Sequence, residues 1–171
     1  YNYNKTKDCS DIITYGIDSS LRGYIENATW HLYGSRTDQS KQNWYLCERG
    51  GNSCITSGPN TGDASVTSKI GLMYLSDYLY ASGYYSSTDT TNGRYDNYGN
   101  KNWLYKGNEW TQTHCTGGEC VWNVTSGSVG SFTADFPYGW RPTFYLKSSV
   151  YVTGGDGSFD NPYTLGCDNC S

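Results

Sequence analysis

The sequence predicts an α+β fold with a mostly antiparallel sheet. Two observations lead to this prediction: strand-like segments outnumber helix-like ones, and the helix-like segments come early in the chain. The second half alternates short strand-like runs with glycine-containing turns, which is typical of an antiparallel meander. At 171 residues the chain is long enough for a single domain with its own core, and we predict one domain over 1–171.

The composition is polar but poor in charge. Asp and Glu number 16 and Lys and Arg 12, a net charge of −4, and charged residues make up only 16% of the chain, against roughly 25% in ordinary soluble domains. This balance argues against nucleic-acid binding and against a polybasic membrane surface, since both need clustered cations. Aromatic residues also reach 16%, which excludes a disordered chain. The profile is typical of a secreted or cell-surface domain rich in β-structure.

The first half predicts three strands and two helices. The segment with the longest apolar run should be a buried central strand, and another alternates with Trp30 and Leu32 on one face. In order, we expect a strand at 11–17, a short helix at 19–28 opened by a serine cap, a strand at 28–34, a helix at 37–50 and the buried strand at 68–82. Residues 83–102 read as a long polar surface excursion.

The second half predicts a meander. We expect a hairpin over 102–113 that turns at 106–108, and two short strands within 120–136 that turn at 126–127. A long strand over 139–155 contains Pro142, so its start should lie at an edge or a bulge. A glycine-rich turn within 154–165 closes the chain.

Seven cysteines indicate an oxidising compartment. Cys47 and Cys54 bracket a Gly-Gly segment, and so do Cys115 and Cys120. Each pair is therefore expected to close its own turn with a disulfide.

The other three cysteines leave two alternatives. Cys9 could be linked to Cys167 or Cys170, which would join the two ends of the domain, or Cys167 and Cys170 could form a local bridge. Zinc is disfavoured, because the spacings differ from a paired CxxC site and the chain has only two histidines.

No export signal, membrane span or lipidation motif is recognisable in the sequence. Because the cysteine chemistry is extracytoplasmic, we expect an export segment to have preceded Tyr1. Four N-glycosylation sequons occur, at Asn4, Asn27, Asn123 and Asn169.

Several blocks resemble a group of surface proteins of gut Firmicutes. They read IENATWHLYG, ERGGNSCITSGPNTGDASVTSKIGLMYLSDYLYASG, NWLY, EWT and YGWRPTFYLKSSVYVTGGDGSFDNPYTL, and together they cover about residues 23–165. The chain departs from the usual pattern at Leu75, Leu79 and Trp140. The Gly139-Trp140-Arg141 sequence is similar to the last core strand of C-type-lectin-like folds, which include the formylglycine-generating enzymes and the variable proteins of diversity-generating retroelements. The resemblance implies a C-type-lectin-like head, often carried on type IV pilin-like proteins.

Catalytic and metal sites are not expected. The enzymes of this superfamily use a copper-binding cysteine pair, but Cys115 and Cys120 read as a disulfide-closed turn. No nucleophile, base and orienting group are apparent, and the acids Glu119, Asp135 and Asp77 cannot be placed relative to one another. We therefore predict a non-enzymatic protein without cofactors.

Two acidic sites have structural interpretations. Asp156 and Asp160 resemble half of a calcium loop without its downstream glutamate, so turn chemistry is favoured over a metal. No calcium-dependent sugar motif of the lectins is present. Arg141 is expected to form a structural ion pair, with Asp77 as its partner.

The aromatic residues are the best candidates for ligand contact. Exposed Tyr and Trp among Ser, Gly and Asn form adaptable binding surfaces on which sugars stack. The candidates are Tyr84, Tyr85, Tyr95, Tyr98, Trp103, Tyr105 and Trp110. For Trp103, Trp110 and Trp122 a place in the core is the favoured alternative.

The sequence therefore predicts an extracellular, disulfide-stapled binding subunit at the cell surface or on a pilus, with an unknown glycan or protein ligand. One alternative is a purely structural pilin or filament subunit whose loops contact other subunits. A second alternative is an oxidase or hydrolase on the formylglycine-generating-enzyme scaffold.

Overall fold

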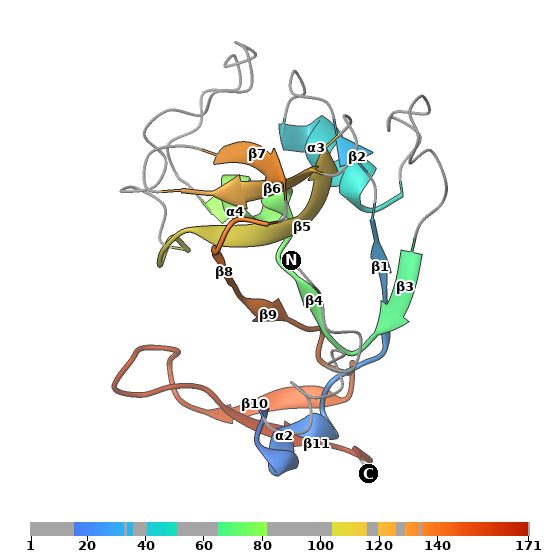
Figure 1. Cartoon of the computed structure of the whole chain (residues 1–171). Helices are drawn as coiled ribbons and strands as arrows, with labels where there is room; N and C mark the ends of the chain where they lie inside the picture. Colours follow the sequence, from blue (N-terminus) through green and yellow to red (C-terminus); the bar gives the residue numbers. More distant parts are fainter. Residues whose placement is uncertain are drawn as a thin grey trace. The chain divides into compact units, whose positions relative to one another are not determined.

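The computed structural model confirms the α+β class, with mostly antiparallel sheets and a few short helices (Figure 1). It describes residues 16–32, 34–35, 41–50, 65–81, 104–115, 120–125, 129–133 and 135–170. The chain divides into two compact units. The sheet unit comprises mainly residues 29–67 and 71–143, and the hairpin unit residues 2–28, 68–70 and 144–171. The two units are interleaved along the chain, and one domain for the whole chain stays a prediction.

The largest sheet lies in the sheet unit. Its strand order is β2 (Gly34–Ser35), β5 (Glu109–Cys115), β6 (Cys120–Val124) and β7 (Val129–Thr133), and β8 (Gly139–Trp140) also pairs with β5. The β5–β6 and β6–β7 pairs are antiparallel, whereas β2 and β8 run parallel to β5. The β6–β7 hairpin confirms the two strands predicted within 120–136.

Two helices, α3 (Lys41–Glu48) and α4 (Leu75–Ala81), supply side chains to the core of this unit. Trp44 of α3 meets Trp122 of β6 edge to face, with ring centroids 4.7 Å apart. Both side chains are buried, and the core also contains Met73, Leu75, Tyr78, Leu79, Val124 and Val129. The core assignment of Trp122, the favoured alternative to ligand contact, is therefore confirmed.

The predicted buried strand at 68–82 is wrong. Only β3 (Ser65–Ser68), beside β1 (Ala28–His31), and β4 (Gly71–Leu72), beside β9 (Pro142–Thr143), are strands, and the later part of the segment, from Leu75 on, is helix α4. The reason lies in hydrogen bonds that distant residues make. The N–H of Leu75 donates to the Thr113 hydroxyl at 3.0 Å, and that of Ser76 donates to the Glu48 carboxylate, so the first turn of the helix is capped from outside its own sequence.

Two other predicted elements of the sheet unit are found in shorter form. Helix α3 occupies the part of 37–50 from Lys41 onward, whereas 36–40 lie outside the described residues. Strand β1 covers the start of 28–34 and buries Trp30, as its alternation predicted.

The hairpin predicted over 102–113 is also incorrect. Its second arm is β5, but among the described residues the first arm, from Leu104 on, is turn and bend. Strand β5 pairs instead with β6, β2 and β8. These neighbours take up the backbone hydrogen bonds that a local partner would have made.

The long strand predicted over 139–155 is broken into β8, β9 and β10 (Val150–Gly154). Pro142 has no N–H to give to a ladder. It lies in the two-residue strand β9, which pairs with β4 alone, so the expectation that the proline sits at an edge is confirmed.

The hairpin unit is built on β10 and β11 (Thr164–Cys167), which pair antiparallel across the glycine-rich turn that the sequence predicted. Helix α2 (Ser19–Arg22) precedes them in the chain, and its cap is Asp18 rather than a serine. Residues 16–17 form no strand, and 11–15 lie outside the described residues.

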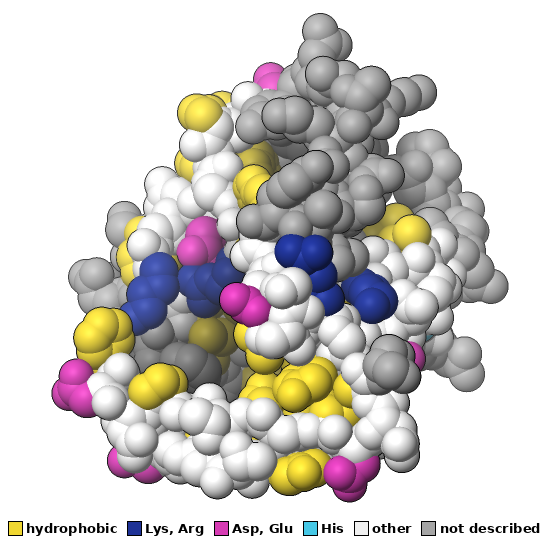
Figure 2. Space-filling model, turned by 90° about the horizontal axis from the view of Figure 1, so that it is seen from below, with side chains coloured by type: hydrophobic (Ala, Val, Ile, Leu, Met, Phe, Trp, Pro, Cys, Tyr) yellow, Lys and Arg dark blue, Asp and Glu magenta, His cyan; other side chains and the backbone are white. Residues whose placement is uncertain are grey.

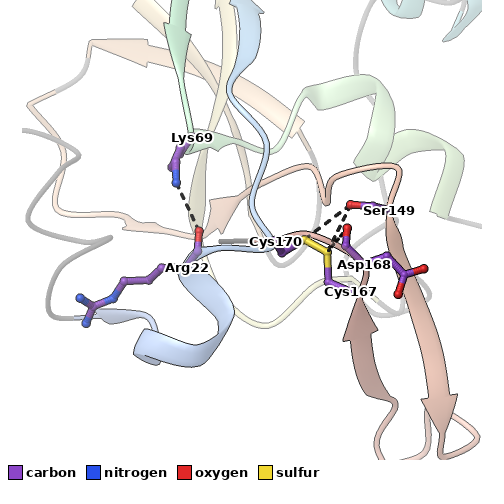
Figure 3. Close-up of a disulfide and its surroundings, with 6 residues drawn as sticks. All are labelled: Arg22, Lys69, Ser149, Cys167, Asp168 and Cys170. Carbon is purple, nitrogen blue, oxygen red and sulfur yellow. Dashed lines mark hydrogen bonds between the residues drawn. A yellow bond between two sulfur atoms is a disulfide. The ribbon is translucent and has the colours of Figure 1, made fainter.

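A disulfide joins Cys167 to Cys170 in the hairpin unit. The Ser149 hydroxyl lies 3.2 Å from one sulfur and 3.5 Å from the other, and the Lys69 ammonium donates to the Arg22 carbonyl at 3.2 Å (Figure 3). Of the two alternatives that the sequence left open, the structure has the local bridge. Cys9 lies outside the described residues.

None of the described helices combines the length and the apolar character needed to cross a membrane. On the face drawn in Figure 2, apolar side chains appear as separate patches, and Lys and Arg side chains gather near the middle of the view.

Candidate binding site

A row of directly paired residues runs across four strands on the face of the sheet that lies opposite the core. Directly paired residues of neighbouring strands share a face. The register pairs Trp110 of β5 with Trp140 of β8 on one side and with Asn123 of β6 on the other, and Asn123 pairs in turn with Gly130 of β7. Trp122 points to the core, so its neighbour Asn123 lies on the opposite face.

Four aromatic side chains meet on this face. Trp110 lies against Tyr138, with centroids 5.1 Å apart, and Tyr138 lies 6.4 Å from Phe132. Phe136 completes the group at 5.2 Å from Phe132 and 5.9 Å from Tyr138. These are ordinary distances for attractive ring pairs. We call Trp110, Phe132, Phe136 and Tyr138 the aromatic face.

The aromatic face is ordered and still open to solvent. Phe132 and Phe136 are each 42% exposed, and the neighbouring Trp140 is 51% exposed. The indole N–H of Trp110 donates to the Phe136 carbonyl at 3.3 Å, which fixes the ring while leaving it half-buried. The face therefore presents ring surface in a defined geometry.

Asn123 is completely buried in the same row. Among the described residues, neither its amide nitrogen nor its amide oxygen has a hydrogen-bond partner. The residue belongs to one of the four sequons, and its burial prevents glycan attachment to the folded chain.

A hydrogen-bonded ion pair lies on the other face of β5, because Glu109 directly precedes Trp110 in the strand. The Arg141 guanidinium donates to the Glu109 carboxylate at 2.7 Å and to the Leu104 carbonyl at 2.8 Å. The expectation that Arg141 takes part in an ion pair is correct, but Asp77 as its partner is wrong, because Asp77 binds Arg49 at 2.6 Å. Glu109 reaches Arg141 because β5 and β8 run side by side, which local sequence does not reveal.

A second polar cluster lies beneath helix α4. Burial raises the pKa of Glu48 to about 7, although hydrogen bonds from Ser76 and Thr113 act in the opposite direction. Arg49 donates to the Ser76 hydroxyl at 3.1 Å, and its guanidinium lies 3.9 Å from the centre of the Tyr45 ring. The contacts of Glu48 and Arg49 with Ser76 and Asp77 thus join the end of α3 to the start of α4.

The structure places two of the predicted contact residues differently. Trp110 is on the aromatic face, whereas Tyr105 packs partly buried against the core, with its hydroxyl donating to Asn108 at 3.2 Å. The other five predicted contact residues lie outside the described residues: Tyr84, Tyr85, Tyr95, Tyr98 and Trp103.

Local sequence patterns did not single out Phe132, Phe136 and Tyr138 as candidates for ligand contact. They join Trp110 only because β7 folds back on β6 and β8 returns to β5. The sequence feature that could have indicated them is the high aromatic content of residues 132–138. Its three aromatic residues are four and then two positions apart.

Within the part of the chain that the structure describes, no group of three or more His, Cys, Asp and Glu side chains is arranged to hold a metal ion. At the turn that resembles half of a calcium loop, the Asp156 carboxylate accepts the N–H of Ser158 at 2.9 Å. Hydrogen bonds from Ser158 and Asn161 lower the pKa of Asp156, so this carboxylate acts as a turn-forming group.

The cysteines of the sheet unit are described only in part. Cys120 is in a disulfide, and Cys47 is buried on α3. Cys54 and the side chain of Cys115 lie outside the described part of the structure. Cys47 carries a thiol rather than a disulfide, so the predicted Cys47–Cys54 bridge is wrong, and the reason is that the Cys47 side chain faces the core from α3. The bridge predicted between Cys115 and Cys120 stays a prediction.

No protein-family model matches the chain, and the comparisons with curated proteins and with solved structures find no match.

Proposed function

We propose that this chain is a non-enzymatic extracellular binding subunit, and that its ligand docks on the aromatic face. The observation that carries the proposal is the cluster of Trp110, Phe132, Phe136 and Tyr138, which is partly exposed yet held by ring contacts. Rigid aromatic surface binds with little loss of side-chain entropy and stacks on sugar rings or on apolar side chains of a protein.

The sheet supports this role because it holds the rings in place. Trp110, Phe132 and Trp140 are all carried by paired strands, and sites built on strands are more precise than sites built on loops. By contrast, exposed aromatics such as Tyr80 on α4 contact only one described ring, that of Tyr45 at 6.1 Å. A cluster offers one continuous contact surface, which a single ring does not.

The location and the fold name are further parts of the proposal. Disulfides at Cys120 and between Cys167 and Cys170 support an oxidising compartment. The sequence blocks that resemble the Firmicutes surface proteins support a C-type-lectin-like head on a cell surface or a type IV pilus. The α+β architecture is compatible with that fold class.

The test is a binding screen of the full chain against immobilised bacterial and mucosal glycans and purified extracellular-matrix proteins. Trp110→Ala should weaken any interaction that the wild type shows, by roughly tenfold or more. Tyr80→Ala is the matched control, because it removes a 51% exposed aromatic of the same unit away from the face, and it should bind as the wild type does. Equal affinity of the two variants would contradict the proposal.

A purely structural filament subunit predicts another result. In that case the wild type would bind no panel member, and Trp110→Ala would change self-association in sedimentation velocity. That outcome would show that the aromatic face contacts other subunits and does not bind a separate ligand.

A further inference from the structure

Asn123 carries both a donor and an acceptor that the protein leaves unused. The side chain is 0% exposed, and in the described part of the molecule its Nδ2 and Oδ1 make no hydrogen bond. A buried amide without partners costs stability, on the order of 1–3 kcal/mol for each group left unpaired. In native structures nearly every buried polar group has a hydrogen-bond partner, whether from the protein, a ligand or an ordered water.

The position of Asn123 ties it to the aromatic face. It lies between Trp110 and Gly130 in the cross-strand row. A Cβ atom on Gly130 would lie 3.5 Å from the Asn123 Oδ1 and 3.3 Å from the Phe132 ring. The Asn123 amide is therefore flanked by Gly130, a residue without a side chain, and lies close to the Phe132 ring, which is 42% exposed.

We propose that Asn123 recognises a neutral sugar, with a pair of vicinal hydroxyls of a pyranose bound to its amide. One hydroxyl donates to Oδ1 and the neighbouring oxygen accepts from Nδ2, while the C–H face of the sugar stacks on the aromatic face. This inference rests on the proposed function and names the ligand class of the same site. Rotation of the partly exposed Phe132 ring about its side-chain torsions opens the way to the amide.

The chemistry of the face favours a neutral ligand. Asn123 and the four rings of the aromatic face are all uncharged. The Arg141 guanidinium is bonded to Glu109, on the other face of β5, and to the Leu104 carbonyl, so it adds no free charge to the aromatic face. A hydroxyl pair matches an amide that has one donor and one acceptor side by side, whereas a carboxylate or phosphate would leave Oδ1 facing another acceptor.

Vicinal hydroxyls also match the amide better than an acetamido group does. A secondary amide in its usual trans form has its N–H and C=O on opposite sides, so it cannot satisfy both atoms of Asn123 at once. Two hydroxyls on adjacent ring carbons point the same way and reach both. The group that Asn123 recognises is therefore a pair of vicinal hydroxyls and not an acetamido group.

The experiment is a titration of the full chain, followed by amide NMR, with three hexasaccharides: cellohexaose, β-1,4-mannohexaose and β-1,4-galactohexaose. At least one should bind and shift the Asn123 side-chain NH2 signals, and its fully O-methylated form should not, because it keeps the ring but has no hydroxyl donors. Asn123→Leu, which is close in shape, should lower that affinity by roughly tenfold to a hundredfold. Its thermal midpoint should be equal to or above that of the wild type, since an unpaired buried amide has been removed.

The outcomes separate the two proposals. If Trp110→Ala and Asn123→Leu each lose hexasaccharide binding, the proposed function and the role of Asn123 are both supported. If Trp110→Ala loses a ligand that Asn123→Leu still binds with wild-type affinity, the proposed function stands and the role of Asn123 is wrong. If none of the three hexasaccharides binds, the sugar assignment is wrong. The wider binding screen with Trp110→Ala and Tyr80→Ala then still tests whether the aromatic face binds a ligand. If Asn123→Leu does not fold, Asn123→Asp takes its place in the test. This variant lacks the NH2 donor, so it should also bind the sugar more weakly.

Discussion

Glu48, buried at the end of α3, accepts the backbone N–H of Ser76 with both carboxylate oxygens at 3.2 Å. Ser76 is the second residue of α4, so an acid 28 residues earlier in the chain caps this helix. The Thr113 hydroxyl donates to the same carboxylate, which links α3, α4 and β5 through one group. This contact explains why the apolar segment after Tyr74 is helical.

We predict that stability falls as pH rises between about 4.5 and 7, because Glu48 has a folded-state pKa of about 7 against an ordinary 4.5. In that range the folded state binds more protons than the unfolded state, so folding loses stability with rising pH, by up to the order of 3 kcal/mol. The free energy of unfolding can be measured by urea unfolding at pH values from 4 to 8. Glu48→Gln, which keeps an acceptor for Ser76, should lose this slope, and an unchanged slope in the variant would refute the assignment.

The Arg141–Glu109 pair should be energetically coupled. A double-mutant cycle of Arg141→Ala with Glu109→Gln should give a coupling energy on the order of 1 kcal/mol, since both side chains are partly buried and directly bonded. The same cycle between Arg141→Ala and Asp77→Asn is the control and should give none, because Asp77 is bonded to Arg49. Coupling to Asp77 as large as that to Glu109 would contradict the observed pairing.

Gly155 should be intolerant of a side chain. Its φ is +81°, and a Cβ there would lie 2.1 Å from the Pro162 carbonyl oxygen across the β10–β11 turn. Gly155→Ala should destabilise the hairpin by about 1–3 kcal/mol, measured by amide exchange at Val152 and Leu165, which are paired in the ladder. Asp160→Ala, at an exposed residue of the same turn, should leave exchange unchanged.

The Cys167–Cys170 bridge should be recovered intact from the native protein. Proteolysis without reduction, followed by mass spectrometry, should yield both cysteines in one linked peptide. Since the bridge closes a loop of only four residues, replacing both by serine should cost about 2 kcal/mol or less. A peptide in which either cysteine is linked to Cys9 would show that the termini are joined instead.

Local patterns in the sequence predicted some elements well. Alternation predicted that Trp30 is buried on β1, and the Ser126-Gly127 turn predicted the β6–β7 hairpin. The segment at 68–82 failed because a short apolar run does not distinguish a buried strand from a buried helix. Its conformation depends on Glu48 and Thr113, which are distant in sequence.

The aromatic face was predictable only in part. Trp110 stood out as an aromatic residue in a polar segment, but its neighbours Phe132 and Tyr138 arrive through strand pairing. The burial of Asn123 was also hidden, because an asparagine within a sequon reads as a surface residue. Such long-range juxtapositions require the sheet register, and no local pattern encodes it.

The most direct test of the aromatic face is the indole N–H region of the ¹⁵N-¹H spectrum, recorded with and without the tightest ligand from the binding screen. Six tryptophans give six indole signals. We predict that the Trp110 signal shifts at saturation while those of the core residues Trp44 and Trp122 do not. A ligand that leaves the Trp110 signal in place, and shifts signals elsewhere in the chain, would show that the aromatic face is not the binding site.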